Sequence, residues 1–468
     1  MLACLGIGLC GAPASAQTLL VMAEPTLRAG TAVGPNENGQ TTSIVRERPI
    51  SLKLGEMRKR TEAAVTDTVW QFQLFDDAPV SFELQRTEST AERGLAYIGK
   101  VVGEPLNTAV IVDNEGVVSG HFVVKGIAYS LQGNSGSGYV ARELRAHRRP
   151  DHPPTSFVSQ SKTATDVEVA RSQALLRALT ATTPPQTPAA AAAIPADTGA
   201  TIDVMVVFYT QAARAANGGT AQTRANVDAQ IALTNAIYAN SNVTHRVRLV
   251  YKGEVQYREA NMDTDLSRLT ATDGYMDEIQ VLRNQYGADL VSLWGVYADY
   301  CGLGWLLQTE ASSFASLGYN VVASPACTAA GQYTFAHELG HNMGLRHDKF
   351  VDAAATVVSP EGTASLSTIG YAHGYVDLTQ RFRTVMAYED QCTTSSISCP
   401  RVPYFSNPAL TYNTAPLGDA ANAHEQRALN HTRETVANFG RRYFLAAPSV
   451  FRNKARLCDA MQNFIVSS

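Results

Sequence analysis

The segment His337–Asp348 holds three histidines and a glutamate at spacings that suit a single metal ion. On a helix, His337 and His341 are one turn apart and project from the same face, so both rings can reach one ion. Gly344 can adopt a positive φ that ends the helix, which brings His347 back as a third ligand. Three protein ligands leave a fourth position for water, and that openness is typical of catalytic rather than structural zinc.

Glu338 lies between the first two ligands and is suited to act as a general base, because it is not itself a ligand. A bare H-E-x-x-H pattern arises by chance in roughly one chain in a hundred of this length, usually on a solvated helix face. Requiring Gly344, His347 and Asp348 as well lowers the chance rate to the order of one in a million. The sequence therefore indicates a catalytic zinc site.

Beyond this segment, Met386 adds a methionine turn, and the combined pattern resembles the metzincin clan of zinc endopeptidases. Asp348 after the third histidine is similar to the reprolysin or adamalysin group. The segments 404–408 and 429–433 are similar to secreted bacterial reprolysin-like enzymes, above all the peptidyl-Asp metalloendopeptidases. This resemblance covers residues 200–445. It implies an α/β (α+β) catalytic domain with a twisted, mostly parallel sheet, an active-site helix and one Zn²⁺.

The resemblance also assigns roles near the zinc. Met386 is expected to be a hydrophobic floor under the imidazoles. Asp348 has two interpretations: an acceptor that fixes a turn beside the ligands, which we favour, or a salt-bridge partner at the surface. Tyr388 is similar in spacing to the zinc-binding tyrosine of astacins and serralysins, whereas reprolysins commonly have proline. It is either a donor to the reacting carbonyl or a tyrosine packed beneath the site.

Specificity follows from the same resemblance. Peptidyl-Asp metalloendopeptidases cut on the amino side of aspartate, so the pocket past the scissile bond must hold a carboxylate. An arginine is the natural partner, because burying that charge unpaired would be prohibitive. In metzincins the segment around and after the methionine turn walls this pocket, and here it offers Arg381, Arg383 and Arg401. We rank Arg383 and Arg401 first, with a solvated surface charge as the alternative for each.

Hydrophobic patterns predict the elements that position these residues. Strands are predicted at 202–208, 247–251, 288–294 and 319–323, and helices near 220–240 and 276–286. Strands that alternate with helices imply a mostly parallel sheet. Residues 302–307 are predicted to form an edge strand, whose free N–H and C=O groups can pair with an extended peptide. Gly304 and Trp305 are therefore expected to contact substrate, although Trp305 has ordinary packing as its alternative.

Residues 17–178 are predicted to form a β-rich domain that resembles a propeptide. Apolar stretches separated by Gly, Asn and Asp predict β-hairpins, and they lie at 96–102, 109–112 and 117–124. We expect this domain to inhibit the enzyme without a thiol, because it contains no cysteine. Asp76 or Asp77 is the candidate blocking carboxylate. The Pro/Ala/Thr-rich residues 179–200 predict an exposed, cleavable linker before a catalytic domain at 201–445.

Export is predicted from the N-terminus and the cysteines. Residues 1–16 are apolar and end in a small-x-small pattern, which predicts a signal peptide even without a basic start. We expect disulfides between Cys301 and Cys327 and between Cys392 and Cys399, although four cysteines allow three connectivities and free buried thiols are the alternative. Cys458, in a C-terminal tail at 446–468, is left over.

Composition bounds the class of protein. With 468 residues, 45% of them hydrophobic, the chain can bury more than one core. A net charge of −4 predicts no nucleic-acid partner, and no segment after the leader is apolar enough to predict a membrane span. We expect a secreted, monomeric zymogen that acts on protein or peptide substrates. The alternatives are a zinc hydrolase of a non-peptide substrate and an inactive metzincin-fold binding module, against which the intact Glu338 argues. Ca²⁺ sites are not readable from this sequence.

Overall fold

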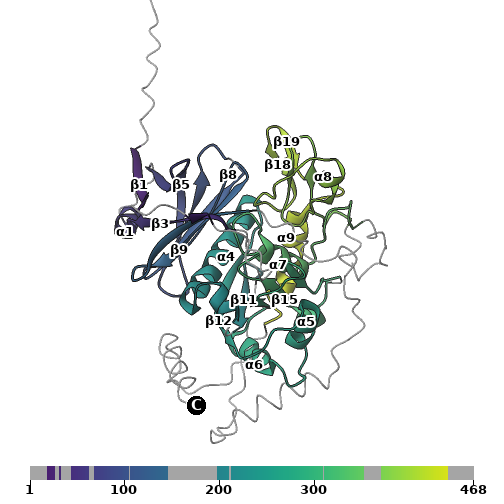
Figure 1. Cartoon of the computed structure of the whole chain (residues 1–468). Coiled ribbons are helices and arrows are strands. Elements are labelled where there is room, and N and C mark those ends of the chain that lie inside the picture. Colours follow the sequence, from purple (N-terminus) through teal and green to yellow (C-terminus); the bar gives the residue numbers. More distant parts are fainter. Residues whose placement is uncertain are drawn as a thin grey trace, which may run out of the picture.

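The computed structural model describes residues 18–26, 31–32, 44–62, 68–104, 106–145, 198–209, 212–308, 310–352 and 370–440. The predicted leader, most of the linker and the tail with Cys458 lie outside the described residues. The described chain forms a β-rich N-terminal unit (residues 18–145) and a mixed C-terminal unit (residues 198–440), which lie side by side in Figure 1. Sheets and helices together agree with the predicted fold class.

The N-terminal unit is one large sheet with a short helix, α1 (Leu54–Glu62). Its strands are β1 Thr18–Pro25, β2 Thr31–Ala32, β3 Ile44–Leu52, β4 Thr68–Phe75, β5 Ala78–Ser89, β6 Leu95–Val101, β7 Thr108–Asn114, β8 Val117–Val124, β9 Ile127–Asn134 and β10 Gly138–Leu144. They are arranged in the order β1-β4-β5-β6-β7-β8-β9-β10-β3-β2, and an additional pairing of β1 with β3 brings the ends together. Aromatic side chains such as Trp70, Phe82 and Phe122 fill the core inside. Asp76 and Asp77, the candidate blocking groups, form salt bridges here with Arg48 and Arg46.

The C-terminal unit is built on a five-stranded sheet in the order β12-β11-β13-β15-β14. Its strands are β11 Thr201–Tyr209, β12 Arg246–Val255, β13 Leu290–Gly295, β14 Gly302–Gly304 and β15 Tyr319–Ala323. Strand β14 runs antiparallel to β15 at the edge, whereas the other pairings are parallel. The predicted edge strand was too long: after Gly304, the N–H of Leu307 bonds to the carbonyl of His341 at 3.0 Å, so the chain leaves the sheet.

Helices cover both faces of this sheet. The helices are α3 Ala212–Ala216, α4 Thr220–Asn240, α5 Met262–Thr270, α6 Asp277–Tyr286, η1 Ser312–Leu317, α7 Thr334–Asn342, α8 Asp390–Thr394 and α9 Glu425–Val436. Successive residues of a strand face opposite sides. Val206 of β11 therefore packs in the cluster that contains α4 and α7, and Val207 packs in the cluster that contains α5 and α6. Two small hairpins complete the unit: β16 Val376–Asp377 with β17 Phe382–Arg383, and β18 Asn407–Tyr412 with β19 Ala415–Leu417.

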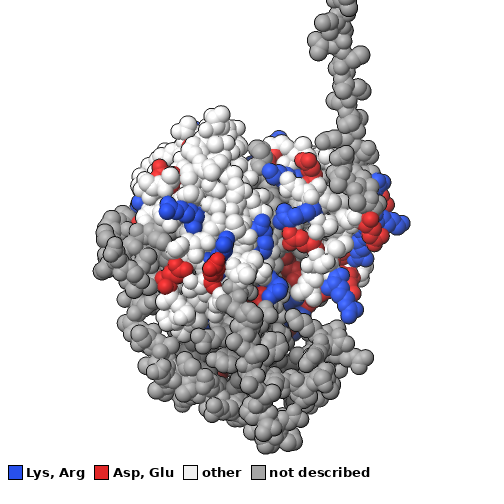
Figure 2. All heavy atoms as spheres, turned by 180° about the vertical axis from the view of Figure 1, so that it is seen from behind, with Lys and Arg blue, Asp and Glu red and all other residues white. Residues whose placement is uncertain are grey.

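Both predicted disulfides are confirmed. Cys301 bonds to Cys327, with a Cα–Cα distance of 5.3 Å, and Cys392 bonds to Cys399, with a Cα–Cα distance of 6.0 Å. Among the described residues, no helix is long and apolar enough to cross a membrane. Figure 2 shows Lys and Arg interspersed with Asp and Glu over the described part of the back face.

Candidate active site

Helix α7 and the turn after it bring the three predicted ligands together. His337 and His341 lie on the helix, one turn apart. Gly344 has a φ of +95°, which L side chains rarely adopt, and the N–H of Leu345 bonds back to the carbonyl of Gly340 at 2.9 Å. The chain therefore reverses as predicted, and His347 comes back beside His337 and His341.

The three imidazoles form a buried group that could hold a metal ion. The Nε2 atom of His341 lies 3.0 Å from Nε2 of His337 and 3.1 Å from Nε2 of His347. The Nδ1 atoms of His337 and His341 lie 3.0 and 2.8 Å from the carbonyl oxygens of Val385 and Leu345. Because a carbonyl only accepts, each Nδ1 carries the proton and leaves a lone pair on Nε2. Converging lone pairs fit a cation such as zinc.

A fourth histidine, which the sequence analysis did not assign to the site, supports the third ligand. His373 is buried, and its Nδ1 donates to the carbonyl of His347 at 2.7 Å. Burial lowers the pKa of His373. Nothing in the spacing of His373 from the zinc motif could have predicted this contact.

Glu338 points its carboxylate at the edge strand. A methyl group on Gly302 would lie 2.3 Å from Oε1, and one on Gly304 would lie 3.1 Å from Oε2. Because both glycines of β14 lack a side chain, they make room for the Glu338 carboxylate. Gly302 was not predicted as a site residue, whereas Gly304 was expected to contact substrate. Trp305 lies past the strand, donates from Nε1 to Thr270 Oγ1 at 2.8 Å and packs on the core.

The end of α7 is tied to the sheet through Asn342. Its Nδ2 donates to the carbonyls of Trp305 and Tyr319 at 2.8 and 3.0 Å. Its Oδ1 accepts from Asn320 Nδ2 at 2.8 Å. These buried amide bonds hold the helix against β14 and β15. Asn342 directly follows the second ligand, and that position is the one signal by which it could have been found.

The methionine turn lies against α7. Met386 is buried, and its Sδ would be 2.8 Å from a methyl group on Gly340, the residue before His341. Tyr388 is also buried, and its ring centroid lies 4.2 Å from that of His347. The Tyr388 ring therefore lies against the third predicted ligand.

Asp348 joins the turn after His347 to the methionine turn. Its Oδ1 accepts from the N–H of Phe350 at 3.1 Å, and its Oδ2 accepts from the N–H of Tyr388 at 2.8 Å. Burial raises the pKa of Asp348, and these backbone donors oppose the rise. The geometry therefore matches the acceptor that fixes a turn.

Two of the three arginines converge on one backbone carbonyl of the methionine turn. Arg383 Nη1 and Arg401 Nη2 lie 2.8 and 3.5 Å from the carbonyl of Ala387, and Arg401 Nη1 donates to the carbonyl of Gln332 at 2.7 Å. Arg381 is exposed. Both guanidinium groups thus contact the residue that precedes Tyr388, the tyrosine whose ring packs on His347.

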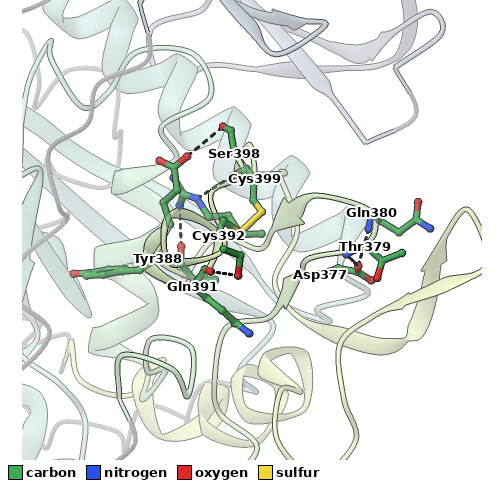
Figure 3. The surroundings of a disulfide bond; sticks show 12 residues. Asp377, Thr379, Gln380, Tyr388, Gln391, Cys392, Ser398 and Cys399 are labelled. Atoms are coloured by element: carbon green, nitrogen blue, oxygen red, sulfur yellow. Dashed lines mark hydrogen bonds between the residues drawn. A yellow bond between two sulfur atoms is a disulfide. The ribbon is translucent and has the colours of Figure 1, made fainter.

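A disulfide supports this arginine pair. Figure 3 shows the Cys392–Cys399 bond in the loop that follows Tyr388. Arg383 Nε donates to the carbonyl of Cys399 at 3.2 Å. The backbone N–H of Val402 donates to the carbonyl of Arg383 at 2.8 Å. The disulfide therefore braces the segment that carries both arginines.

The chain is similar to known bacterial peptidases over much of its length. Residues 198–406 match the reprolysin-type profile of metallo-peptidase family M12. The peptidyl-Asp metalloendopeptidase of Xanthomonas campestris pv. campestris is 33% identical over 341 residues, which cover 72% of this chain and 70% of the relative. A protein of the same name from Stenotrophomonas maltophilia strain R551-3 is 32% identical over 357 residues, 75% of each chain. Its counterpart in strain K279a is 39% identical over 248 residues, 52% of this chain and 53% of the relative.

Proposed function

The chain belongs to metallo-peptidase family M12 and is a zinc metalloendopeptidase, and from this premise we propose that it is a secreted zymogen whose mature form cuts peptide bonds on the amino side of aspartate. The family implies the metzincin fold, a metal, typically zinc, and protein or peptide substrates. One observation carries the proposal: three histidine Nε2 atoms converge within reach of one ion, and the carboxylate of Glu338, the residue after the first of them, faces an edge strand.

We assign His337, His341 and His347 as the zinc ligands. When bound, zinc lowers the pKa of a water molecule and polarises the scissile carbonyl. The carbonyls of Val385 and Leu345 keep two of the imidazoles in the tautomer that offers Nε2. His373 donates to the backbone carbonyl of the third ligand, and Asp348 joins the turn after that ligand to the backbone of Tyr388.

Glu338 is the proposed general base. It takes a proton from the attacking water and passes it to the leaving amine, which suits a carboxylate that is not a ligand. An extended substrate would pair with the outer edge of β14, where Gly302 and Gly304 already lie against that carboxylate. Tyr388 is the proposed donor to the carbonyl oxygen, since its ring packs on His347.

Aspartate specificity is assigned to Arg383 and Arg401. Both relatives with the longest matches are named peptidyl-Asp metalloendopeptidases. A carboxylate in the pocket needs a fixed cationic partner, and a guanidinium can bind both of its oxygens. The two side chains already converge on the carbonyl of Ala387, next to Tyr388.

Latency is assigned to the N-terminal part, residues 17–178, and activation to a cut in the linker at 179–200. Two disulfides agree with export into an oxidising compartment. Asp76 and Asp77 are paired with arginines of their own unit, so neither carboxylate is assigned as the blocking group. Thiol-modifying reagents should fail to activate the precursor, whereas a linker cut should succeed. Full activity of the uncut precursor would contradict latency.

Mapping of cleavage sites on a denatured protein mixture, with and without chelator, tests the proposal. We expect cuts before aspartate that chelator abolishes and added zinc restores. Cuts before aliphatic residues would remove the aspartate specificity and leave the peptidase assignment intact. If the linker-cut protein makes no cut with zinc present, the chain is an inactive member of the family.

A further inference from the structure

The two units complete one hydrophobic core. Every residue of β7 is buried, although only one face of the strand looks into the N-terminal sheet's own core. On the other face, Val110 and Val112 belong to the same cluster as Val227 and Leu233 of α4. A sheet that is apolar on both faces must be covered on both. The N-terminal unit alone would therefore expose an apolar face.

Helix α4 has the complementary property. Of its 21 residues, 15 are buried, and Arg224 and Asp228 are its only charged residues. It packs on β6, β7 and β8 on one side and on β12 on the other. A helix that is buried all round lies inside a protein rather than at its surface. Without the N-terminal unit, α4 would be the outer face of the C-terminal unit.

Hydrogen bonds join polar side chains of α4 to the N-terminal unit. Gln222 of α4 donates from Nε2 to the carbonyl of Val118 at 2.8 Å and accepts at Oε1 from the N–H of Gly133 at 3.0 Å. Asn240, at the other end of α4, donates to Thr108 Oγ1 at 2.8 Å. Each amide also has a partner in its own unit, since Gln222 Nε2 lies 3.2 Å from Asn226 Oδ1 and Asn240 Nδ2 lies 3.3 Å from the carbonyl of Pro403. Amide side chains at both ends of α4 thus join the two units.

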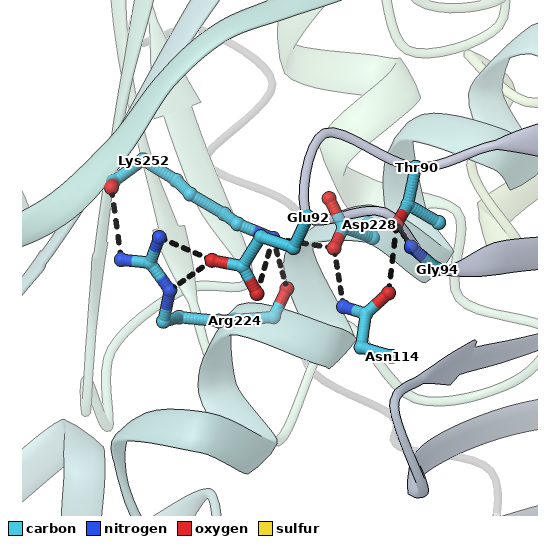
Figure 4. Close-up of polar contacts among 7 residues, drawn as sticks. All are labelled: Thr90, Glu92, Gly94, Asn114, Arg224, Asp228 and Lys252. Atoms are coloured by element: carbon cyan, nitrogen blue, oxygen red, sulfur yellow. Dashed lines mark hydrogen bonds and ion pairs between the residues drawn. The ribbon is translucent and has the colours of Figure 1, made fainter. Parts of the chain in front are cut away.

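A buried ionic network crosses the same boundary (Figure 4). Asn114 Nδ2 donates to Asp228 Oδ2 at 2.6 Å, and Asp228 is paired with Lys252. Glu92, from the N-terminal unit, pairs with Arg224 and lies 3.4 Å from Lys252 Nζ. Burial raises the pKa of Asp228 and lowers that of Lys252, so the pair is desolvated. Removal of one partner from such a network leaves a buried charge uncompensated.

We propose that the N-terminal unit remains bound after the linker is cut, so that the mature enzyme is a non-covalent complex of two chains and activation by the cut does not require release of the unit. Its partner surface is α4 with Arg224, Asp228 and Lys252. This complex rests on the proposed function, because two chains arise only if the linker is cut. The complementary surfaces themselves do not depend on catalysis or on specificity.

The test starts from the full chain with a recognition sequence for a site-specific protease placed within residues 182–197. After the cut, native size-exclusion chromatography at micromolar concentration should give one peak, and a denaturing gel of that peak should show both pieces. Two separate peaks under native conditions would overturn the proposal. Association is measured without substrate, so an error in the proposed specificity or activity leaves this result unchanged.

Glu92→Ala combined with Asn114→Ala removes only the N-terminal side of the network and leaves the Lys252–Asp228 pair in place. After the cut we expect association weaker by on the order of tenfold or more. Glu83→Ala, an exposed glutamate of β5 in the same sheet, is the matched control and should leave association unchanged. The uncut double variant reports folding, because the linker keeps the units at high effective concentration. Equal dissociation of the control and the double variant would overturn the role of the network.

Discussion

Asp348 Oδ2 accepts a hydrogen bond from the backbone N–H of Tyr388 at 2.8 Å, across 40 residues of sequence. The residue after the third histidine is thereby joined to the residue that packs on that histidine's ring. The position of His347 therefore depends on the methionine turn as well as on α7.

Asp348→Ala should weaken zinc binding by roughly 10- to 100-fold, the usual effect of losing a group that orients a ligand. The substitution leaves the N–H groups of Tyr388 and Phe350 without their carboxylate. Competition with a chromogenic chelator measures the affinity. Asp377→Ala is the control, since that carboxylate also accepts two backbone N–H groups, at a turn shown in Figure 3. Equal losses in both variants would show that Asp348 acts only on stability.

Glu338→Gln should keep zinc and lose on the order of 10²- to 10⁴-fold in kcat, because the amide cannot take the water's proton. His347→Ala should lose zinc itself, because a proposed ligand is gone. Metal content and casein cleavage separate the two effects. Near wild-type cleavage by Glu338→Gln would make the general-base assignment wrong. Stoichiometric zinc affinity in His347→Ala would mean that the third ligand lies elsewhere.

Gly302→Ala should reduce kcat by on the order of 10²-fold while zinc stays bound, since a shift of about 1 Å at a catalytic group has that effect. The added methyl would lie 2.3 Å from Glu338 Oε1, so the carboxylate must move. Gly55→Ala is the control, because a methyl group there meets nothing within 4 Å. Unchanged kcat in Gly302→Ala would separate the edge strand from the general base.

Arg383→Ala and Arg401→Ala should each lower kcat/KM for peptides with aspartate after the scissile bond by on the order of 10²-fold, and affect matched asparagine peptides little. The lost guanidinium would leave the substrate carboxylate buried without a partner. Arg381→Ala is the control, because this neighbouring arginine is exposed. An aspartate preference that survives in both variants would contradict the assignment and leave the peptidase function standing.

The free energy of unfolding should fall as pH rises, because Glu425 is buried. Burial raises its pKa from 4.5 to about 8, so between these values the folded state holds a proton that the unfolded state has released. The stabilising contribution is complete below pH 4.5 and is lost as pH rises through about 8. Glu425→Gln keeps an oxygen for the N–H of Ser406, which donates to Oε2 at 2.7 Å. Urea unfolding across this range should show wild type losing stability relative to the variant, and parallel curves would contradict the assignment.

Local features of the site could be predicted from the sequence because they depend on neighbours along the chain. The spacing of His337 and His341 follows from the helical period, and the reversal at Gly344 follows from the conformations open to glycine. The disulfide between Cys392 and Cys399 joins residues only seven apart. The strands of the catalytic sheet were likewise readable as short apolar runs between helical segments.

Contacts between distant segments were decided by the tertiary structure alone. His373 reaches the carbonyl of His347 from 26 residues away, and Gly302 makes room for Glu338 from the edge of the sheet. The edge strand ended early because Leu307 bonds to α7, which no local pattern encodes. The apolar run of β7 showed that the strand is buried, but not that α4 of the other unit covers its second face. Periodicity reports which residues avoid water, whereas their partners depend on how the chain packs.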